Sequence, residues 1–100
     1  MFYLYILYSS SSDLYYVGYT NNYARRLQEH NHSEHSTFTS KHRPWELKAV
    51  YNCGNEEAFA MKVERFIKKQ KSRKLIEQLV QGGTFTGILA QPFRVPDVRH

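Results

Sequence analysis

Apolar and polar positions divide the start of the chain into two short hydrophobic runs. Residues 2–8 are almost uniformly apolar, residues 14–19 are rich in Tyr and Val, and a polar segment over residues 9–13 separates them. Runs of this length and composition that flank a polar turn predict a β-hairpin. Because the first run does not alternate, we expect its central part to be covered on both faces by later elements.

The hydrophobic spacing then changes from that of a strand to that of a helix. From about residue 22 to residue 30, Tyr23 and Leu27 lie four positions apart and predict a buried stripe. Arg26 and His30 are also four apart and share a neighbouring face of the same helix. The residues able to cap its first turn are Thr20, Asn21 and Asn22.

A polar segment and a third strand follow this helix. Residues 31–43 are polar and predict a surface loop or a short irregular helix, which ends before Pro44. Over residues 45–51 the hydrophobic period is two, which predicts a strand with one buried face. The residues expected on that face are Trp45, Leu47, Ala49 and Tyr51.

Two helical patterns come after this strand. Glu56 and Glu57 place negative charge at the start of a helix that extends to about Gln70, which is favourable to the helix dipole. Its expected apolar stripe consists of Phe59, Val63, Phe66 and Ile67. Ser72 can cap a last helix, which the consecutive glycines at 82 and 83 terminate.

Together these elements predict an α+β fold of mixed α/β character. A small three-stranded, mainly antiparallel sheet is flanked by about three helices, in the order β-β-α-(loop)-β-α-α. We assign residues 1–82 to this domain and residues 83–100 to a C-terminal tail. We expect the tail to be extended or partly ordered, because it contains prolines at 92 and 96 between its apolar residues.

Composition and charge indicate a single globular domain that suits a polyanionic partner. The chain has 100 residues, of which 41% are hydrophobic and 15% aromatic, which allows one compact core. Fourteen Lys and Arg against nine Asp and Glu give a net charge of +5. The single cysteine excludes an internal disulfide and fits a reducing cytoplasm. We expect no signal peptide, because the apolar opening lacks a basic leader, a long apolar run and a small-residue cleavage site. We also expect no membrane span, because no stretch reaches about 20 apolar residues.

Half of the cationic residues are concentrated in one segment. Seven of the fourteen Lys and Arg lie between Lys62 and Lys74, where Glu64 is the only acid. A carboxylate among so many cationic side chains is either a salt-bridge partner or a metal ligand. Taken alone, Glu64 and Lys68 could form an ordinary exposed helix pair, which contributes about 0.3 to 0.5 kcal/mol.

Five short motifs follow one another along the chain. They are Tyr3-Leu4-Tyr5, Tyr16-Val17-Gly18, Arg25-Arg26-Leu27-Gln28-Glu29-His30-Asn31, Arg43-Pro44-Trp45-Glu46-Leu47 and Val63-Glu64-Arg65-Phe66-Ile67-Lys68-Lys69. In this order they resemble the GIY-YIG endonuclease domain, in a short stand-alone form related to the nuclease domain of the bacterial excision-repair complex. The resemblance covers roughly residues 2 to 80. One departure is that Tyr3 and Leu4 stand where the family has glycine and isoleucine, whereas Tyr5 keeps the family tyrosine.

The resemblance implies a metal-dependent endonuclease that hydrolyses phosphodiester bonds in DNA rather than in RNA. It also implies that the structure of the DNA selects the site of cleavage, in repair or recombination. Glu64 would bind one Mg²⁺ or Mn²⁺, and Arg26 would balance the charge on the phosphate. Tyr5 or Tyr16 would orient or deprotonate the attacking water, and His30 would contact phosphate or share in proton transfer. Further nucleic-acid contacts are expected from Gly18, Arg25, Lys41, Arg43 and Lys68.

Simpler interpretations of the same residues lead to other functions. Tyrosines in strands usually pack in a core, and Arg25 with Arg26 could form a solvated helix face. The chain could therefore be a nucleic-acid-binding module without catalysis, or a protein-interaction domain that docks through residues 84–100. A protein partner or a homodimer is compatible with each function. The nuclease hypothesis requires that Tyr5 and Tyr16 face a common cleft with Glu64.

Overall fold

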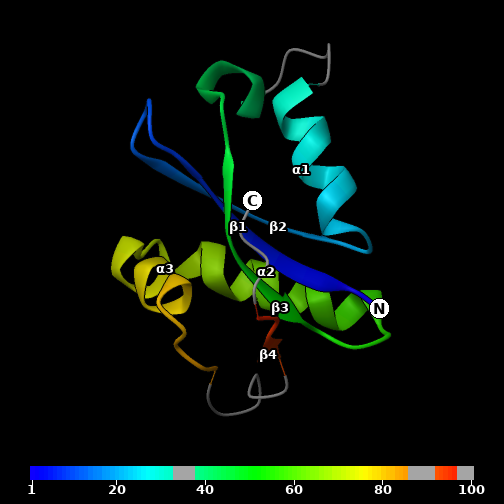
Figure 1. Ribbon diagram of the computed structural model, residues 1–100. Coiled ribbons are helices and arrows are strands. Elements are labelled where there is room, and N and C mark those ends of the chain that lie inside the picture. Colours follow the sequence, from blue (N-terminus) through cyan, green and yellow to red (C-terminus); the bar gives the residue numbers. More distant parts are fainter. Residues whose placement is uncertain (33–37, 86–91, 97–100) are drawn as a thin grey trace.

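The two hydrophobic runs at the start of the chain form the predicted hairpin. Strands β1 (Tyr3–Ser9) and β2 (Leu14–Thr20) pair antiparallel over their whole length, with Tyr5 opposite Gly18. The structure is a computed structural model that describes residues 1–32, 38–85 and 92–96 (Figure 1). Asp13 turns the chain between the two strands with a left-handed backbone, at a φ of 53°.

The hairpin is one side of a four-stranded antiparallel sheet. Strand β3 (Glu46–Asn52) pairs with β1, and the two-residue strand β4 (Phe93–Arg94) pairs with β3, so the order is β2-β1-β3-β4. The predicted α+β class is confirmed, but the sheet has one strand more than the three we expected. The pattern of the sequence could not reveal β4, because two residues are too few to show a period.

The alternation predicted for the third strand breaks at Lys48. The register between β1 and β3 shifts after Ile6, which pairs with Ala49, because the next residue of β1 pairs with Leu47. Lys48 is therefore an extra residue, and this β-bulge exchanges the two faces of the strand. Leu47 and Val50 consequently lie in one core cluster, while Ala49 lies in the other. The prediction of a single buried face on this strand is wrong.

Within the described residues, three α-helices and one short 3-10 helix complete the fold. Their bounds are α1 (Tyr23–His32), η1 (Thr39–His42), α2 (Glu57–Gln70) and α3 (Arg73–Val80). The Asn22 side chain caps α1, since its Oδ1 accepts from the backbone N–H of Arg25 at 3.0 Å. Ser72 caps α3 in the same way, by accepting from the N–H of Leu75 at 3.1 Å. None of the helices within the described ranges is long and apolar enough to cross a membrane.

Helices cover both faces of the sheet, with α2 and α3 on one side and α1 on the other (Figure 1). The core under α2 and α3 includes Leu4, Ile6, Ala49, Val63 and Ile67. The core on the α1 side includes Tyr5, Leu7, Leu27, Trp45 and Val50. Strand β1 is thus buried on both faces, as its uniform hydrophobicity predicts. Phe66 does not join the stripe that we expected on α2, because its ring is 41% exposed.

Candidate active site

Tyr5 lies at the centre of the site that the sequence predicts. Its side chain is 2% exposed and crosses from β1 over Gly18 of the neighbouring strand. A Cβ atom at position 18 would collide with the Tyr5 hydroxyl oxygen and with the adjacent ring carbon. The absence of a side chain at Gly18 therefore allows the hydroxyl to lie at β2, which is the edge strand of the sheet.

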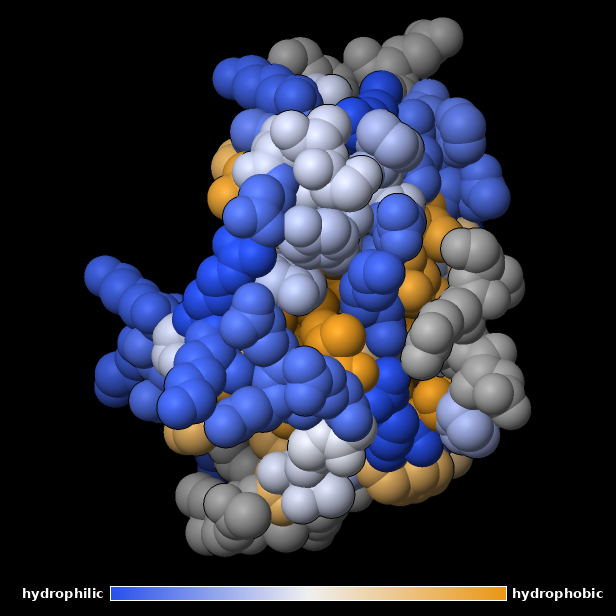
Figure 2. All heavy atoms as spheres, turned by 60° about the vertical axis from the view of Figure 1, so that its left-hand side comes forward, coloured by the Kyte–Doolittle hydropathy of each residue, from blue (hydrophilic) through white to orange (hydrophobic). Residues whose placement is uncertain are grey.

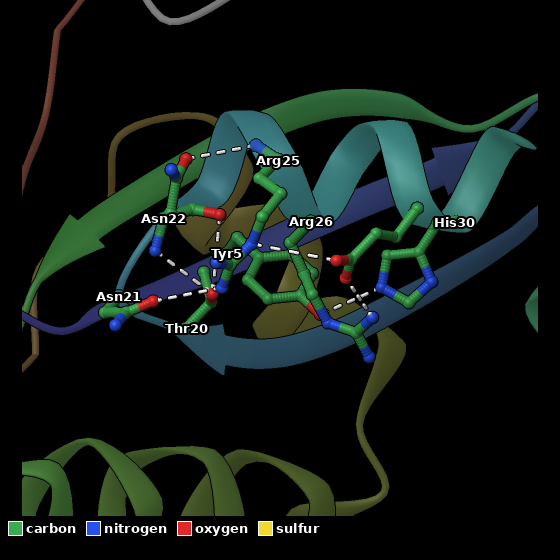
Figure 3. A network of polar contacts seen from close by, with 8 residues as sticks. Tyr5, Thr20, Asn21, Asn22, Arg25, Arg26 and His30 are labelled. Carbon is green, nitrogen blue, oxygen red and sulfur yellow. Dashed lines mark hydrogen bonds and ion pairs between the residues drawn. The ribbon is translucent and has the colours of Figure 1, made fainter. Parts of the chain in front are cut away.

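A buried hydrogen bond joins Tyr5 to His30. The Tyr5 hydroxyl lies 2.9 Å from Nε2 of His30, which is 4% exposed on α1 (Figure 3). Burial raises the pKa of Tyr5 well above its usual value; nearby Tyr16 and Glu64 add to this, and Arg26 opposes it. Burial also lowers the pKa of His30 to about 4, and the charge of Arg26 contributes. At neutral pH the bond thus joins a neutral phenol to a neutral imidazole.

Tyr16 connects this pair to the opposite side of the molecule. Its ring centroid lies 6.3 Å from that of Tyr5 and 4.9 Å from that of His30. The ammonium of Lys68, from α2, stands 5.4 Å from the same ring centroid. Because α2 covers the other face of the sheet, Lys68 reaches Tyr16 around the edge of β2.

Arg26 lies beside the buried pair and is partly open to solvent. Its side chain is 38% exposed, and its Nη1 donates to Oε1 of Glu29 at 2.9 Å. Arg25 forms a second, longer ion pair with Glu29 at 3.7 Å and donates to the side chain of Asn21. Figure 3 shows these side chains with Tyr5 and His30 on one flank of α1.

Glu64 approaches the same edge of the sheet from α2. Its carboxylate is 21% exposed and lies 3.7 Å from the ammonium of Lys68. Glu64 adds to the raised pKa of Tyr5 and also to that of Tyr19, for which burial and a hydrogen bond to Glu57 are larger causes. Tyr5 and Tyr19 pack on opposite faces of the sheet. The carboxylate is linked to β2 through Lys68, whose ammonium lies over the Tyr16 ring.

The oxygen donors at this edge suit a hard divalent cation. One partly exposed carboxylate, together with waters and phosphate oxygens, is a common coordination pattern for Mg²⁺. Residues 1–32, 38–85 and 92–96 contain no group of three His, Cys, Asp or Glu side chains that could hold a metal ion by themselves. We therefore take Glu64 as the candidate residue for a metal shared with a substrate phosphate.

The residues predicted to contact nucleic acid have different surroundings. Gly18 is buried under Tyr5, whereas Lys68 lies at the site, next to Tyr16 and Glu64. Arg43 lies close to His30, and its Nε donates to the His30 carbonyl at 2.6 Å. Arg25 is exposed on α1, and Lys41 is exposed on η1.

Two structural contacts that hold the site were not predicted. Asn31 forms a pair of hydrogen bonds with the backbone of Trp45, donating to its carbonyl at 3.0 Å and accepting from its N–H at 2.7 Å. This clamp fixes the end of α1, and with it His30, to the start of β3. Glu29 is the other contact, and its spacing from Arg25 and Arg26 is a signal that could have identified it. No such signal in the sequence links Asn31 to Trp45.

The sheet and the residues at its edge define a small α+β domain of the nuclease type. A model of the GIY-YIG catalytic domain family matches residues 1–77, and the chain belongs to this family. The resemblance given by the five motifs is thereby confirmed. Domains of this family are nucleases that act on nucleic acid and generally use a divalent metal ion.

The most informative matches among curated proteins are small UPF0213 proteins. The UPF0213 protein in the ldhD 5′ region of Pediococcus acidilactici is 33% identical over an alignment of 84 residues. The alignment covers 82% of this chain and 84% of the relative. A UPF0213 protein of Bacillus licheniformis is 33% identical over 90 residues, 90% of each chain. One from Bacillus cereus is 34% identical over 73 residues, 73% of this chain and 74% of the relative. The chain is therefore similar in extent to these small proteins.

Proposed function

We propose that this protein is a metal-dependent endonuclease that hydrolyses phosphodiester bonds in DNA. The observation that carries the proposal is that four side chains from the α1 face gather beside β2, where Lys68 of α2 lies over the Tyr16 ring and pairs with Glu64. The four are Tyr5, Tyr16, Arg26 and His30. Arg26, Lys68 and Glu64 are the partly exposed members of this group, so a long polyanion would reach them beside the edge strand.

Arg26 is proposed to bind the scissile phosphate and to balance the charge that develops on it. Its guanidinium is held by Glu29 in an exposed ion pair, which contributes little to stability and can be exchanged for another anion. A phosphate accepts two parallel hydrogen bonds from a planar guanidinium, an arrangement that a lysine ammonium cannot reproduce. Arg26 would therefore stabilise the transition state through bonds of fixed direction.

Tyr5 is proposed to orient the attacking water. Because burial raises its pKa, the hydroxyl keeps its proton at neutral pH and acts through its hydrogen bonds. His30 fixes the direction of that hydroxyl at 2.9 Å and remains uncharged. Tyr16 packs against both rings and limits their movement. Tyr5 is thus a better candidate than Tyr16 for the contact with water.

Glu64 is proposed to hold the divalent ion, Mg²⁺ or Mn²⁺. Such an ion would supply positive charge to the scissile phosphate and favour ionisation of water at neutral pH. Lys68 lies 3.7 Å from the carboxylate, so it can move to a neighbouring phosphate when the ion binds. The role of Glu64 requires a carboxylate, whereas the pair with Lys68 alone would be dispensable.

A cleavage assay with matched variants tests the proposal. Wild type, Glu64→Gln and Glu46→Gln are incubated with branched, nicked and single-stranded DNA and with RNA, in Mg²⁺, Mn²⁺ or EDTA. Glu46 is a suitable control because it also forms an exposed ion pair with a lysine, at 3.0 Å. We expect cleavage of DNA by wild type and Glu46→Gln, and none by Glu64→Gln or in EDTA. Cleavage by Glu64→Gln that survives EDTA would remove Glu64 from the metal site.

A nucleic-acid-binding module without catalysis is the second candidate. The observation that favours it is the concentration of cations on α2 and α3, which does not depend on Glu64. Binding of this kind loses affinity steeply with salt, by about one unit of log–log slope for each phosphate neutralised. Salt-dependent binding without cleavage of any substrate in the panel would favour this function over hydrolysis.

Direction by DNA structure, as in repair or recombination, is part of the proposal. Reading a base sequence needs an element that enters a groove and presents side chains to base edges. The site residues instead gather at a strand edge and offer contacts suited to phosphate, so the shape of the DNA is the more suitable cue. The branched and nicked substrates of the panel test this point against intact duplex DNA.

A further inference from the structure

A hollow of about 230 Å³ lies between the end of the hairpin and the turn that joins α2 to α3. Its apolar wall includes Ile67, which is buried, and the half-buried Leu14 and Ile76. Lys68 and Lys71 also line it and are exposed, so they form its outer rim. The hairpin turn and α3 lie at the left of Figure 1, and this side comes forward in Figure 2, where hydrophilic side chains flank a strip of exposed hydrophobic atoms.

The hollow shares Lys68 with the candidate active site. Lys68 lines the hollow and also lies 5.4 Å from the ring centroid of Tyr16 and 3.7 Å from the Glu64 carboxylate. Tyr15 lines the hollow, and the next residue, Tyr16, packs on the other face of the sheet. Since β2 is the edge strand, a DNA strand that crosses this edge reaches both the hollow and the candidate site.

The cations of the rim differ in how firmly they are held. Arg73 also lines the hollow, but Asp13 accepts from its Nη2 at 2.6 Å and Glu77 accepts from its Nε at 3.2 Å. Its charge is thus balanced by two carboxylates. Lys71 forms no ion pair with the described part of the chain, and the pair of Lys68 is long and exposed. Lys68 and Lys71 are therefore the cations with charge to offer a phosphate.

We propose that this hollow binds an unpaired nucleotide adjacent to the scissile phosphate, with its base against the apolar wall and its phosphate between Lys68 and Lys71. A base inside a duplex is paired and stacked and cannot enter, whereas an unpaired base has a free apolar face to bury. The inference rests on the proposed function and specifies its substrate class. DNA with an unpaired nucleotide beside the cut is the preferred substrate over intact duplex.

The test compares the affinity of the protein for two DNA duplexes that share one backbone and differ in the presence of one base. Fluorescence anisotropy in EDTA, which prevents cleavage, measures affinity for two duplexes that differ only in one bulged position. That position holds an adenine nucleotide in one duplex and an abasic residue in the other. Wild type should bind the adenine duplex several-fold more tightly, because only this duplex can fill the hollow. Equal affinities for the two duplexes would overturn the proposal.

Variants of the wall and the rim separate the two contacts. Ile76→Phe reduces the volume of the hollow and should remove the preference for adenine over the abasic residue. Lys71→Gly removes the cation without straining a backbone whose φ is 49°. This change should weaken binding to both duplexes equally, by roughly 3- to 10-fold at low salt. Lys69→Ala is the matched control, since Lys69 is exposed on α2 but does not line the hollow.

The results distinguish failure of this inference from failure of the proposed function. Circular dichroism melting confirms that each variant is folded, and the wild-type comparison of adenine with abasic DNA needs no variant. Preference for adenine without cleavage in Mg²⁺ or Mn²⁺ would support the hollow and contradict hydrolysis. Cleavage without any preference would support hydrolysis and contradict the hollow. A preference that persists in Ile76→Phe places the base elsewhere and also contradicts the proposal.

Discussion

The two faces of the sheet differ in the partners of their buried polar groups. The face under α2 and α3 buries aliphatic side chains such as Leu4 and Ile6, and its buried Tyr51 hydroxyl donates only to backbone carbonyls, those of Leu79 and Gly83. The face toward α1 buries aromatic and titratable groups, including Tyr5, His30 and Trp45, with a hydrogen bond between the first two. Aliphatic burial is non-directional, whereas a buried phenol and imidazole need defined partners. One face therefore mainly stabilises the domain, and the other holds chemical groups in fixed positions.

The sharpest way to test this comparison is to remove bulk from the aliphatic face. Leu79→Ala deletes three buried carbons from a residue that is 2% exposed. We expect it to lower the free energy of unfolding by about 2 to 5 kcal/mol, measured by urea denaturation. Activity per folded molecule should change little, because Leu79 lies on α3 and does not line the hollow. A large loss of activity in the folded fraction would mean that the two faces are not separate in function.

A change on the α1 face should lower activity and leave stability almost unchanged. Arg26→Lys keeps the charge but loses the planar guanidinium, so we expect kcat to fall by about 10²-fold. Thermal melting should show a stability close to that of wild type, because the lost ion pair with Glu29 is exposed. Arg25→Lys is the control, since Arg25 lies one position away and pairs with the same acid. An equal effect of both changes would remove the special role of Arg26.

Acid should destabilise the α1 face through His30. Burial lowers its pKa from 6.5 to about 4, so the folded protein binds fewer protons at His30 than the unfolded chain does. Stability is thus retained above pH 6.5 and lost as the pH falls toward 4, by roughly 3 kcal/mol. Urea unfolding at pH 7, 5.5 and 4 measures this loss. His30→Gln, which does not titrate, should show a smaller decrease, and an equal decrease would contradict the assignment.

At the contact between the two hairpin strands we expect a smaller loss of stability than the one acid causes at His30. Gly18→Ala places a methyl group against the Tyr5 hydroxyl and should cost about 1 to 3 kcal/mol. The ring must shift, so cleavage should weaken as well. Adding Tyr5→Phe removes the colliding oxygen, and urea denaturation of the double variant should recover part of the lost stability but no activity. No recovery would mean that position 18 acts through a different contact.

Local patterns were enough to predict most of the helices and strands. The uniform run before residue 9, the helical spacing after residue 56 and the cap at Ser72 all correspond to elements in the structure. These features depend on neighbours in the chain, so a period or a capping residue reveals them. The bulge at Lys48 and strand β4 depend on the partner strand, and the prediction failed at both.

In the candidate site, too, some features follow from the local sequence and others from contacts between distant residues. The sequence alone determined its residue types and the family to which the chain belongs, because the order of the motifs carries that information. Tertiary structure decided that the Tyr5 hydroxyl crosses Gly18, that His30 is buried against it, and that Lys68 links Tyr16 to Glu64 around the edge of β2. These contacts join residues that are distant in the chain. They arise only when both helical layers pack on one narrow sheet, which brings opposite faces together at its edge strand.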